Sequence, residues 1–195
     1  MVKTLLLQLS SISSIIIYLL FANSVYASEE IEVTGDSNDV YIEQTSSAQY
    51  FYIGVVGSYN SISVEQTNSA LANHSLTSTI TGDINTLTVL QNGAGTKQAI
   101  IDITGDSNTA SIAQKDAGNH YLDLDIVGDS HSATILQEGA GNKSATVELT
   151  NSGGAWNFNL TQTGSGTSTY GESGNPAVGA CYTLSGCTLN IYQTN

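Results

Sequence analysis

The chain repeats one ten-residue phrase six times, and each copy begins with glycine and ends with glutamine. Two copies are GDSNDVYIEQ from Gly35 and GDSNTASIAQ from Gly105. The opening glycines lie 22, 25, 23, 23 and 25 residues apart, at Gly35, Gly57, Gly82, Gly105, Gly128 and Gly153. Such a period is typical of a solenoid or another array in which each repeat packs only on its neighbours. The repeat therefore constrains the fold more than any other feature of the sequence.

Residue types alternate within each phrase. Counting glycine as zero, positions 5 and 7 are apolar and position 9 is always Gln, whereas positions 4, 6 and 8 are mostly polar. A period of two predicts a strand with one buried face. A second alternating stretch precedes each next glycine, as in Leu76, Ser78 and Ile80. Turn-forming sequences such as NGAG at 92–95 separate the stretches. Each unit therefore predicts strand, turn, strand, turn.

These units predict an all-β fold, a β-solenoid of about six to seven two-stranded coils with like positions stacked about 4.8 Å apart. A buried glutamine without partners would cost about 1 to 3 kcal/mol, but stacked glutamines can bond to one another along the axis. Inward asparagines at position 3 predict a second, interrupted ladder, in which His131 replaces Asn. The expected structural ladder residues are Gln44, Gln66, Gln91, Gln114, Gln137 and Gln162, with Asn38, Asn60, Asn85 and Asn108.

Segments outside the repeats predict export. Residues 1–27 carry Lys3, an apolar stretch and a small-residue cleavage pattern ending at Ala27, which indicates a secretory signal peptide. The alternative is a transmembrane anchor, but polar residues from Gln8 onward interrupt the stretch. Residues 28–162 form the repeat domain.

The C-terminal segment, residues 163–195, is Gly/Ser-rich, and the period-two pattern resumes at its end with Leu189, Ile191 and Gln193. This resumption predicts a terminal coil. Cys181 and Cys187 lie close together in an exported chain, which favours a disulfide over metal or redox chemistry.

The charge balance argues against a nucleic-acid partner. Beyond residue 27, only three lysines oppose 17 acids, and there is no arginine, so the formal charge is −14. Asp83, Asp106 and Asp129 recur at one turn position, where they either splay into solvent or hold Ca²⁺. The calcium-binding nonapeptide GGxGxDxUx is absent, so we expect no metal and no other cofactor.

The repeats resemble those of the curlin family, the subunits of bacterial curli fibres. The resemblance is carried by the inward Asn, the apolar pair and the Gln, followed by QEGAGN at 137–142 and Ala145, and by QNGAG at 91–95. It covers residues 31 to about 162. Family repeats usually carry a second Gln at the end of the second strand, where this chain has Val55, Ile80, Ile103 or Ile126.

Membership would imply secretion through an outer-membrane machinery of a Gram-negative cell and assembly into a cell-surface amyloid fibre, or fimbrium. Such a fibre serves adhesion and biofilm matrix. The implied partners are further copies of the chain and a second curlin-like subunit.

Two other functions are open. A monomeric solenoid adhesin could bind surface glycans through the outward Tyr41, Tyr52 and Tyr59, although tyrosine is also a common surface residue of strands. A β-helix enzyme is less favoured because short coils leave little room for site-building loops. We expect His74, His120 and His131 to fall at unlike places in the repeat, and Asp123 and Asp125 to alternate outward, so no catalytic residue is predicted.

Overall fold

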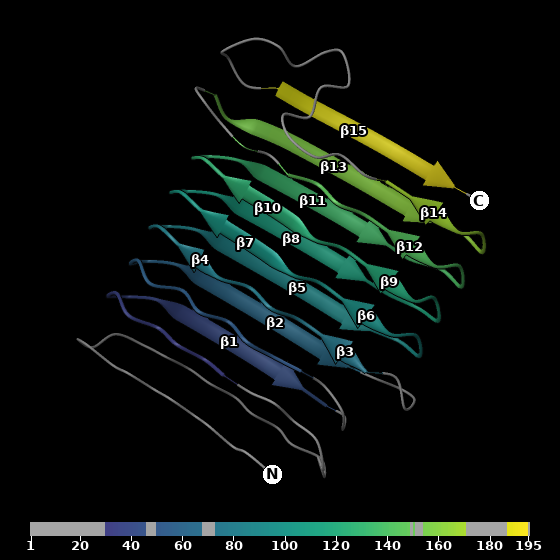
Figure 1. The fold of residues 1–195 in the computed structure, drawn as a ribbon, viewed down its shortest axis with the longest axis horizontal. Coiled ribbons are helices and arrows are strands. Elements are labelled where there is room, and N and C mark those ends of the chain that lie inside the picture. Colours follow the sequence, from purple (N-terminus) through teal and green to yellow (C-terminus); the bar gives the residue numbers. More distant parts are fainter. Residues whose placement is uncertain are drawn as a thin grey trace.

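Parallel pairing of each strand with its copy one coil away organises the whole fold (Figure 1). The computed structural model describes residues 30–45, 50–67, 73–148, 150, 154–170 and 187–194. The predicted signal peptide lies outside this part of the chain, and so do Cys181 and the side chain of Cys187. No helix in the described ranges could cross a bilayer.

One side of the solenoid is a seven-stranded parallel sheet built from the repeated phrase. Its strands pair so that every ladder glutamine aligns with the next, from Gln44 opposite Gln66 to Gln162 opposite Gln193. In spatial order the strands are β1 (Asp39–Gln44), β2 (Ser61–Thr67), β5 (Thr86–Asn92), β8 (Thr109–Gln114), β11 (Ser132–Gln137), β13 (Trp156–Thr163) and β15 (Cys187–Thr194).

The other side is divided into two narrow sheets. One consists of β3 (His74–Ser75), β6 (Lys97–Gln98), β9 (His120–Tyr121), β12 (Lys143–Ser144) and β14 (Ser168–Thr169). The second consists of β4 (Ile80–Thr81), β7 (Ile101–Thr104) and β10 (Leu124–Val127). The sequence predicted a single strand on this side of each coil. Three coils instead carry two short strands on this side.

A change in the sign of φ accounts for this division. All four residues of β7 have positive φ, at 100°, 85°, 84° and 91° from Ile101 to Thr104. The residues of β10 likewise have positive φ. A positive φ is costly for β-branched residues, so this side of the solenoid carries the backbone strain.

The predicted fold class is confirmed as an all-β solenoid, with about five closed coils rather than six to seven. The long-strand sheet has seven levels and the sheet containing β3 has five. At the level of β1, the described residues of the opposite side form no strand and pair through an isolated bridge from Tyr50 to Ser75 and a bond from the Val55 N–H to the Thr79 carbonyl at 2.8 Å.

Apolar side chains from both sides meet between the sheets. Ile112 of β8 is 1% exposed, and Ala99 and Ile101 from the opposite side are fully buried. The same alternation recurs in every coil, so the core is a continuous column. At the C-terminal end of the sheet, β15 pairs with β13, and its Leu189 and Ile191 pack against this core.

The Gly-Asp turns enter the long strands through one left-handed residue per coil. Ser37, Tyr59, Ile84, Ser107 and Ser130 all occupy the second position after glycine, with φ between 58° and 61°. At Ile84 the β-branched side chain is disfavoured in this conformation and is also 58% exposed, so it gains little from burial.

We expect Ile84→Asn to raise the free energy of unfolding by about 1 kcal/mol, because asparagine tolerates the left-handed region. Urea unfolding measures the change. Ile84→Val is the matched control, since it keeps the β-branch and should give no gain. Equal stability of all three proteins would contradict the strain argument.

Candidate functional site

A continuous ladder of glutamine side chains runs through the solenoid. Each Nε2 donates to Oε1 of the glutamine in the next coil towards the C-terminus. The six successive distances from Gln44 to Gln193 are 3.1, 2.6, 2.9, 2.8, 2.9 and 2.7 Å. The six glutamines predicted from the sequence all lie in this ladder and are at most 2% exposed. Gln193 extends it by one level.

The second amide proton joins the two sides of each coil. Gln91 donates it to the carbonyl of Ser75 at 2.9 Å, Gln114 to that of Gln98 at 2.8 Å, and Gln137 to that of Tyr121 at 2.7 Å. Both protons of these amide groups are therefore used. A buried amide network in which every group is hydrogen-bonded holds the side chains in a single arrangement. An unpaired amide in the same interior would lower the free energy of unfolding.

The asparagine ladder was also predicted, but it bonds differently. Asn60 Oδ1 accepts from the backbone N–H of Asn85 at 2.8 Å, and Asn60 Nδ2 donates to the carbonyl of Gly82 at 2.8 Å. Asn85 and Asn108 repeat the pattern one and two coils further on. These side chains tie successive turns together mainly through the backbone, although Asn60 Nδ2 also donates to Asn38 Oδ1 at 3.1 Å, whereas the glutamines bond to one another at every level.

His131 continues the asparagine ladder, as expected. Its backbone N–H donates to Asn108 Oδ1 at 2.8 Å, and its Nδ1 accepts from the backbone N–H of Trp156 at 3.2 Å. Acceptance at Nδ1 requires the neutral tautomer with the proton on Nε2. Burial lowers the pKa of His131, which favours this neutral form.

A third inward column was not predicted from the sequence. His74, Lys97, His120 and Lys143 pair level by level in the sheet of β3, β6, β9 and β12, and all four are at most 2% exposed. The expectation that His74 and His120 occupy unlike places was wrong. Lys97, His120 and Lys143 each lie six residues after a ladder glutamine, whereas His74 lies eight after Gln66, and this longer turn hid the equivalence.

The buried lysines bind the carbonyl oxygens of the glycine-rich turns. Lys97 Nζ donates to Gly95 of its own coil at 2.9 Å and, in the next coil, to Asp116 at 2.9 Å and Gly118 at 2.6 Å. A Cβ on Gly95 would lie 2.2 Å from the Gly118 oxygen, so the close approach of these turns requires glycine. Burial lowers the pKa of Lys97 to about 8, although the charge of Asp116 opposes the shift.

Lys143 repeats this arrangement two coils further on, where its Nζ donates to Gly164 and Gly166 of the next coil. Burial lowers its pKa as well. Lys97 thus cross-links two successive turns from the inside, as a bound cation would, and Lys143 ties its own strand to the turn of the next coil.

The two histidines of this column are held in the neutral form. Burial, together with the charge of the adjacent Lys97, lowers the pKa of both His74 and His120 to about 4. His120 Nε2 lies 2.7 Å from the carbonyl of Lys115, and its buried Nδ1 has no partner among the described residues. Side chains enclosed in this way cannot contact a substrate in solution.

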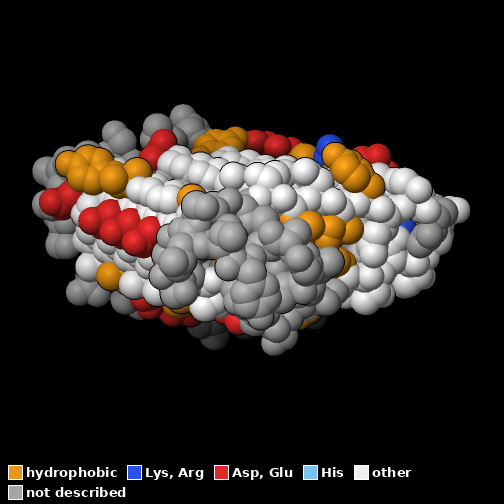
Figure 2. Space-filling view, turned by 90° about the horizontal axis from the view of Figure 1, so that it is seen from above, with side chains coloured by type: hydrophobic (Ala, Val, Ile, Leu, Met, Phe, Trp, Pro, Cys, Tyr) orange, Lys and Arg blue, Asp and Glu red, His pale blue; other side chains and the backbone are white. Residues whose placement is uncertain are grey.

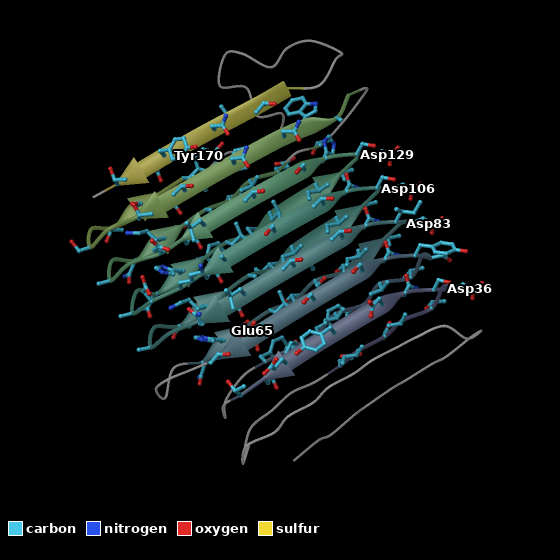
Figure 3. The ribbon with its side chains drawn as sticks, turned by 180° about the vertical axis from the view of Figure 1, so that it is seen from behind. Asp36, Glu65, Asp83, Asp106, Asp129 and Tyr170 are labelled. Atoms are coloured by element: carbon cyan, nitrogen blue, oxygen red, sulfur yellow. The ribbon has the colours of Figure 1, made fainter. Side chains whose placement is uncertain are left out.

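The turn aspartates form an exposed column at one narrow edge of the solenoid (Figure 3). Asp83, Asp106 and Asp129 each use Oδ1 to accept the backbone N–H of the preceding coil, at 2.7 to 2.8 Å. Viewed from above, acidic side chains gather at this edge (Figure 2). These carboxylates brace the turns, and the described residues contain no group of three or more His, Cys, Asp or Glu that could hold a metal ion.

The tyrosines considered for glycan binding do not converge. Tyr41 points outward from the long-strand sheet, Tyr52 lies on the opposite side of the coil, and Tyr59 is in a Gly-Asp turn. Asp123 and Asp125 are two residues apart, just before and just after the start of β10. The rings of His74 and His120 lie against backbone carbonyls and not against these aspartates. Neither set makes a compact site. Comparison with protein-family models, curated proteins and solved structures gives no match to this chain.

We expect Gln114→Leu to lower the free energy of unfolding by about 2 to 4 kcal/mol. The substitution leaves Gln91 Nε2 and Gln137 Oε1 without ladder partners in a buried setting. Urea unfolding provides the measurement. Gln98→Leu, at an exposed position of β6, is the matched control and should change stability by less than about 0.5 kcal/mol. A similar loss of unfolding free energy in both variants would show that the ladder hydrogen bond contributes no extra stability.

Stability should fall as pH decreases from about 6.5 to about 4.5. In this window the unfolded histidines bind protons, whereas folded His74 and His120, with pKa near 4, do not. The free energy of unfolding therefore rises with pH here, by on the order of 2 to 3 kcal/mol per histidine over the full shift.

Urea unfolding at several pH values, on wild type and on His74→Asn/His120→Asn, tests this dependence. The double variant should show a clearly flatter profile between pH 6.5 and 4.5. A profile as steep as that of wild type would assign the pH dependence to other groups.

Proposed function

We propose that this chain is a secreted structural subunit of curli-like amyloid fibres, which self-assembles edge to edge through its solenoid coils. The fibre would lie at the surface of a Gram-negative cell and serve adhesion and biofilm matrix. The resemblance of the repeats to curlin supports the family, and the stacked parallel sheets with in-register glutamines support the amyloid-type assembly.

The direction of the glutamine ladder is the observation that carries the proposal. Every ladder bond runs from Nε2 towards the C-terminal coil. At the last level, Gln193 Nε2 uses one proton for the carbonyl of Thr169, and no acceptor among the described residues takes its other proton. At the first level, nothing in the described ranges donates to Gln44 Oε1. The two ends of the ladder are thus a donor and an acceptor that fit each other.

The edges of the long-strand sheet have the same complementarity. Within the described chain, β1 pairs only with β2 and β15 pairs only with β13, so each offers one open edge. Stacking β15 of one copy on β1 of the next continues the parallel ladder, whereas a two-fold contact would set donor against donor. A head-to-tail contact of this kind does not close on itself and produces a filament.

The proposed partners follow from this geometry and from the resemblance. The principal partner is another copy of the chain, and a second curlin-like subunit would start the stack. Export would use an outer-membrane secretion machinery. The acidic surface disfavours nucleic acid.

Electron microscopy and X-ray fibre diffraction on residues 28–195 test the proposal. We expect filaments with a meridional reflection at about 4.7 to 4.8 Å. Gln44→Leu/Gln193→Leu should slow elongation at least tenfold because both ends of the ladder are lost. Gln98→Leu should elongate at the wild-type rate. A protein that stays monomeric alone and with preformed seeds would overturn the fibre function.

A further inference from the structure

The centre of the long-strand sheet has an outer surface without charge. Three neighbouring strands, β5, β8 and β11, share three outward positions that pair in register, and β5 has a fourth, Asn92, beyond them. We define the neutral face as these nine residues, which carry only hydroxyl or aliphatic side chains: Thr86, Thr88, Leu90, Thr109, Ser111, Ala113, Ser132, Thr134 and Leu136. The in-register pairing places them in three straight columns.

The opposite side of the same coils carries a group of neighbouring acids. Asp102 of β7 pairs with Asp125 of β10, and Asp123 and Glu148 lie near Asp125. Burial and the charges of these three acids raise the pKa of Asp125. The two surfaces are thus chemically different. One has nine contiguous uncharged positions and the other has stacked acids, in a chain with formal charge −13.

We propose that the neutral face pairs with the neutral face of a second copy, so that fibres of this chain associate laterally in twos. The inference rests on the proposed fibre function and adds a second interface to it. Short hydroxyl and aliphatic side chains on a regular sheet allow two sheets to approach to about 10 Å and interdigitate, as in the dry interfaces between cross-β sheets.

The size of the face determines when pairing occurs. Three strands about 4.8 Å apart and three outward positions about 6.8 Å apart cover roughly 300 Å² per copy, well below the roughly 800 Å² per partner of a stable complex. Single subunits therefore do not dimerise through it. In a filament the face recurs in every subunit, and pairing becomes cooperative through the many linked contacts.

Charge limits the association to pairs. Once two neutral faces are in contact, each filament presents its acidic side outward, where stacked carboxylates on opposing filaments repel by about 1 kcal/mol per close pair even in water. A third filament therefore meets these acids rather than a second copy of the neutral face.

Cryo-electron microscopy and atomic-force height measurements of filaments from residues 28–195 test the proposal. Wild type should form paired filaments of twice the single height. Thr88→Lys/Thr134→Lys sets like charges against each other across the interface, so the fraction of paired filaments should fall at least tenfold while the elongation rate stays unchanged. Thr104→Lys, an exposed threonine on the acidic side, is the matched control and should leave pairing intact.

The outcomes separate the two proposals. Wild-type filaments that remain single, or pairs that persist in Thr88→Lys/Thr134→Lys, would overturn lateral pairing and leave the fibre function standing. Single wild-type filaments that pellet with an insoluble β-glucan, and lose that binding in the double variant, would assign the face to a glycan instead. The absence of any filament would overturn the fibre function and this inference with it.

Discussion

The fold depends on one hydrogen bond repeated along its axis, the bond from the Nε2 of a buried glutamine to the Oε1 of the next. Hydrophobic burial drives the coils together but does not specify how they align, since Ile, Val and Leu at neighbouring levels are interchangeable. A slip of two residues, the smallest that keeps the same face inward, would place a glutamine beside an apolar side chain, at a cost of about 1 to 3 kcal/mol for each unpaired amide. The ladder from Gln44 to Gln193 therefore sets the register.

Most of this arrangement could be predicted from the repeated phrase. Its alternation indicated which residues point inward, and invariant glutamines on an inward position require partners that only a stack supplies. The asparagine ladder was also predictable, including the substitution by His131. Its bonding to the backbone was not, because residue type does not reveal whether Oδ1 meets another amide or an N–H group.

The sequence concealed the His/Lys column and the division of the second side for separate physical reasons. Lysine is normally a surface residue, so the burial of Lys97 and Lys143 depends on turn carbonyls that converge only in three dimensions. The unequal spacing after Gln66 also misaligned His74. Along β7, the residue types favour an ordinary strand, and nothing in their alternation indicates positive φ at Ile101.

The eight-residue spacing from Gln66 to His74 shows that coils of this solenoid tolerate different lengths. The segment from Gln66 to His74 is two residues longer than the corresponding segments of the next coils, yet β2 still pairs in register with β5, and β3 with β6. Length changes between the columns are thus absorbed outside the hydrogen-bonded ladders. An insertion between Gln66 and His74 should therefore leave both pairings intact and display a foreign peptide once per subunit along an otherwise unaltered scaffold.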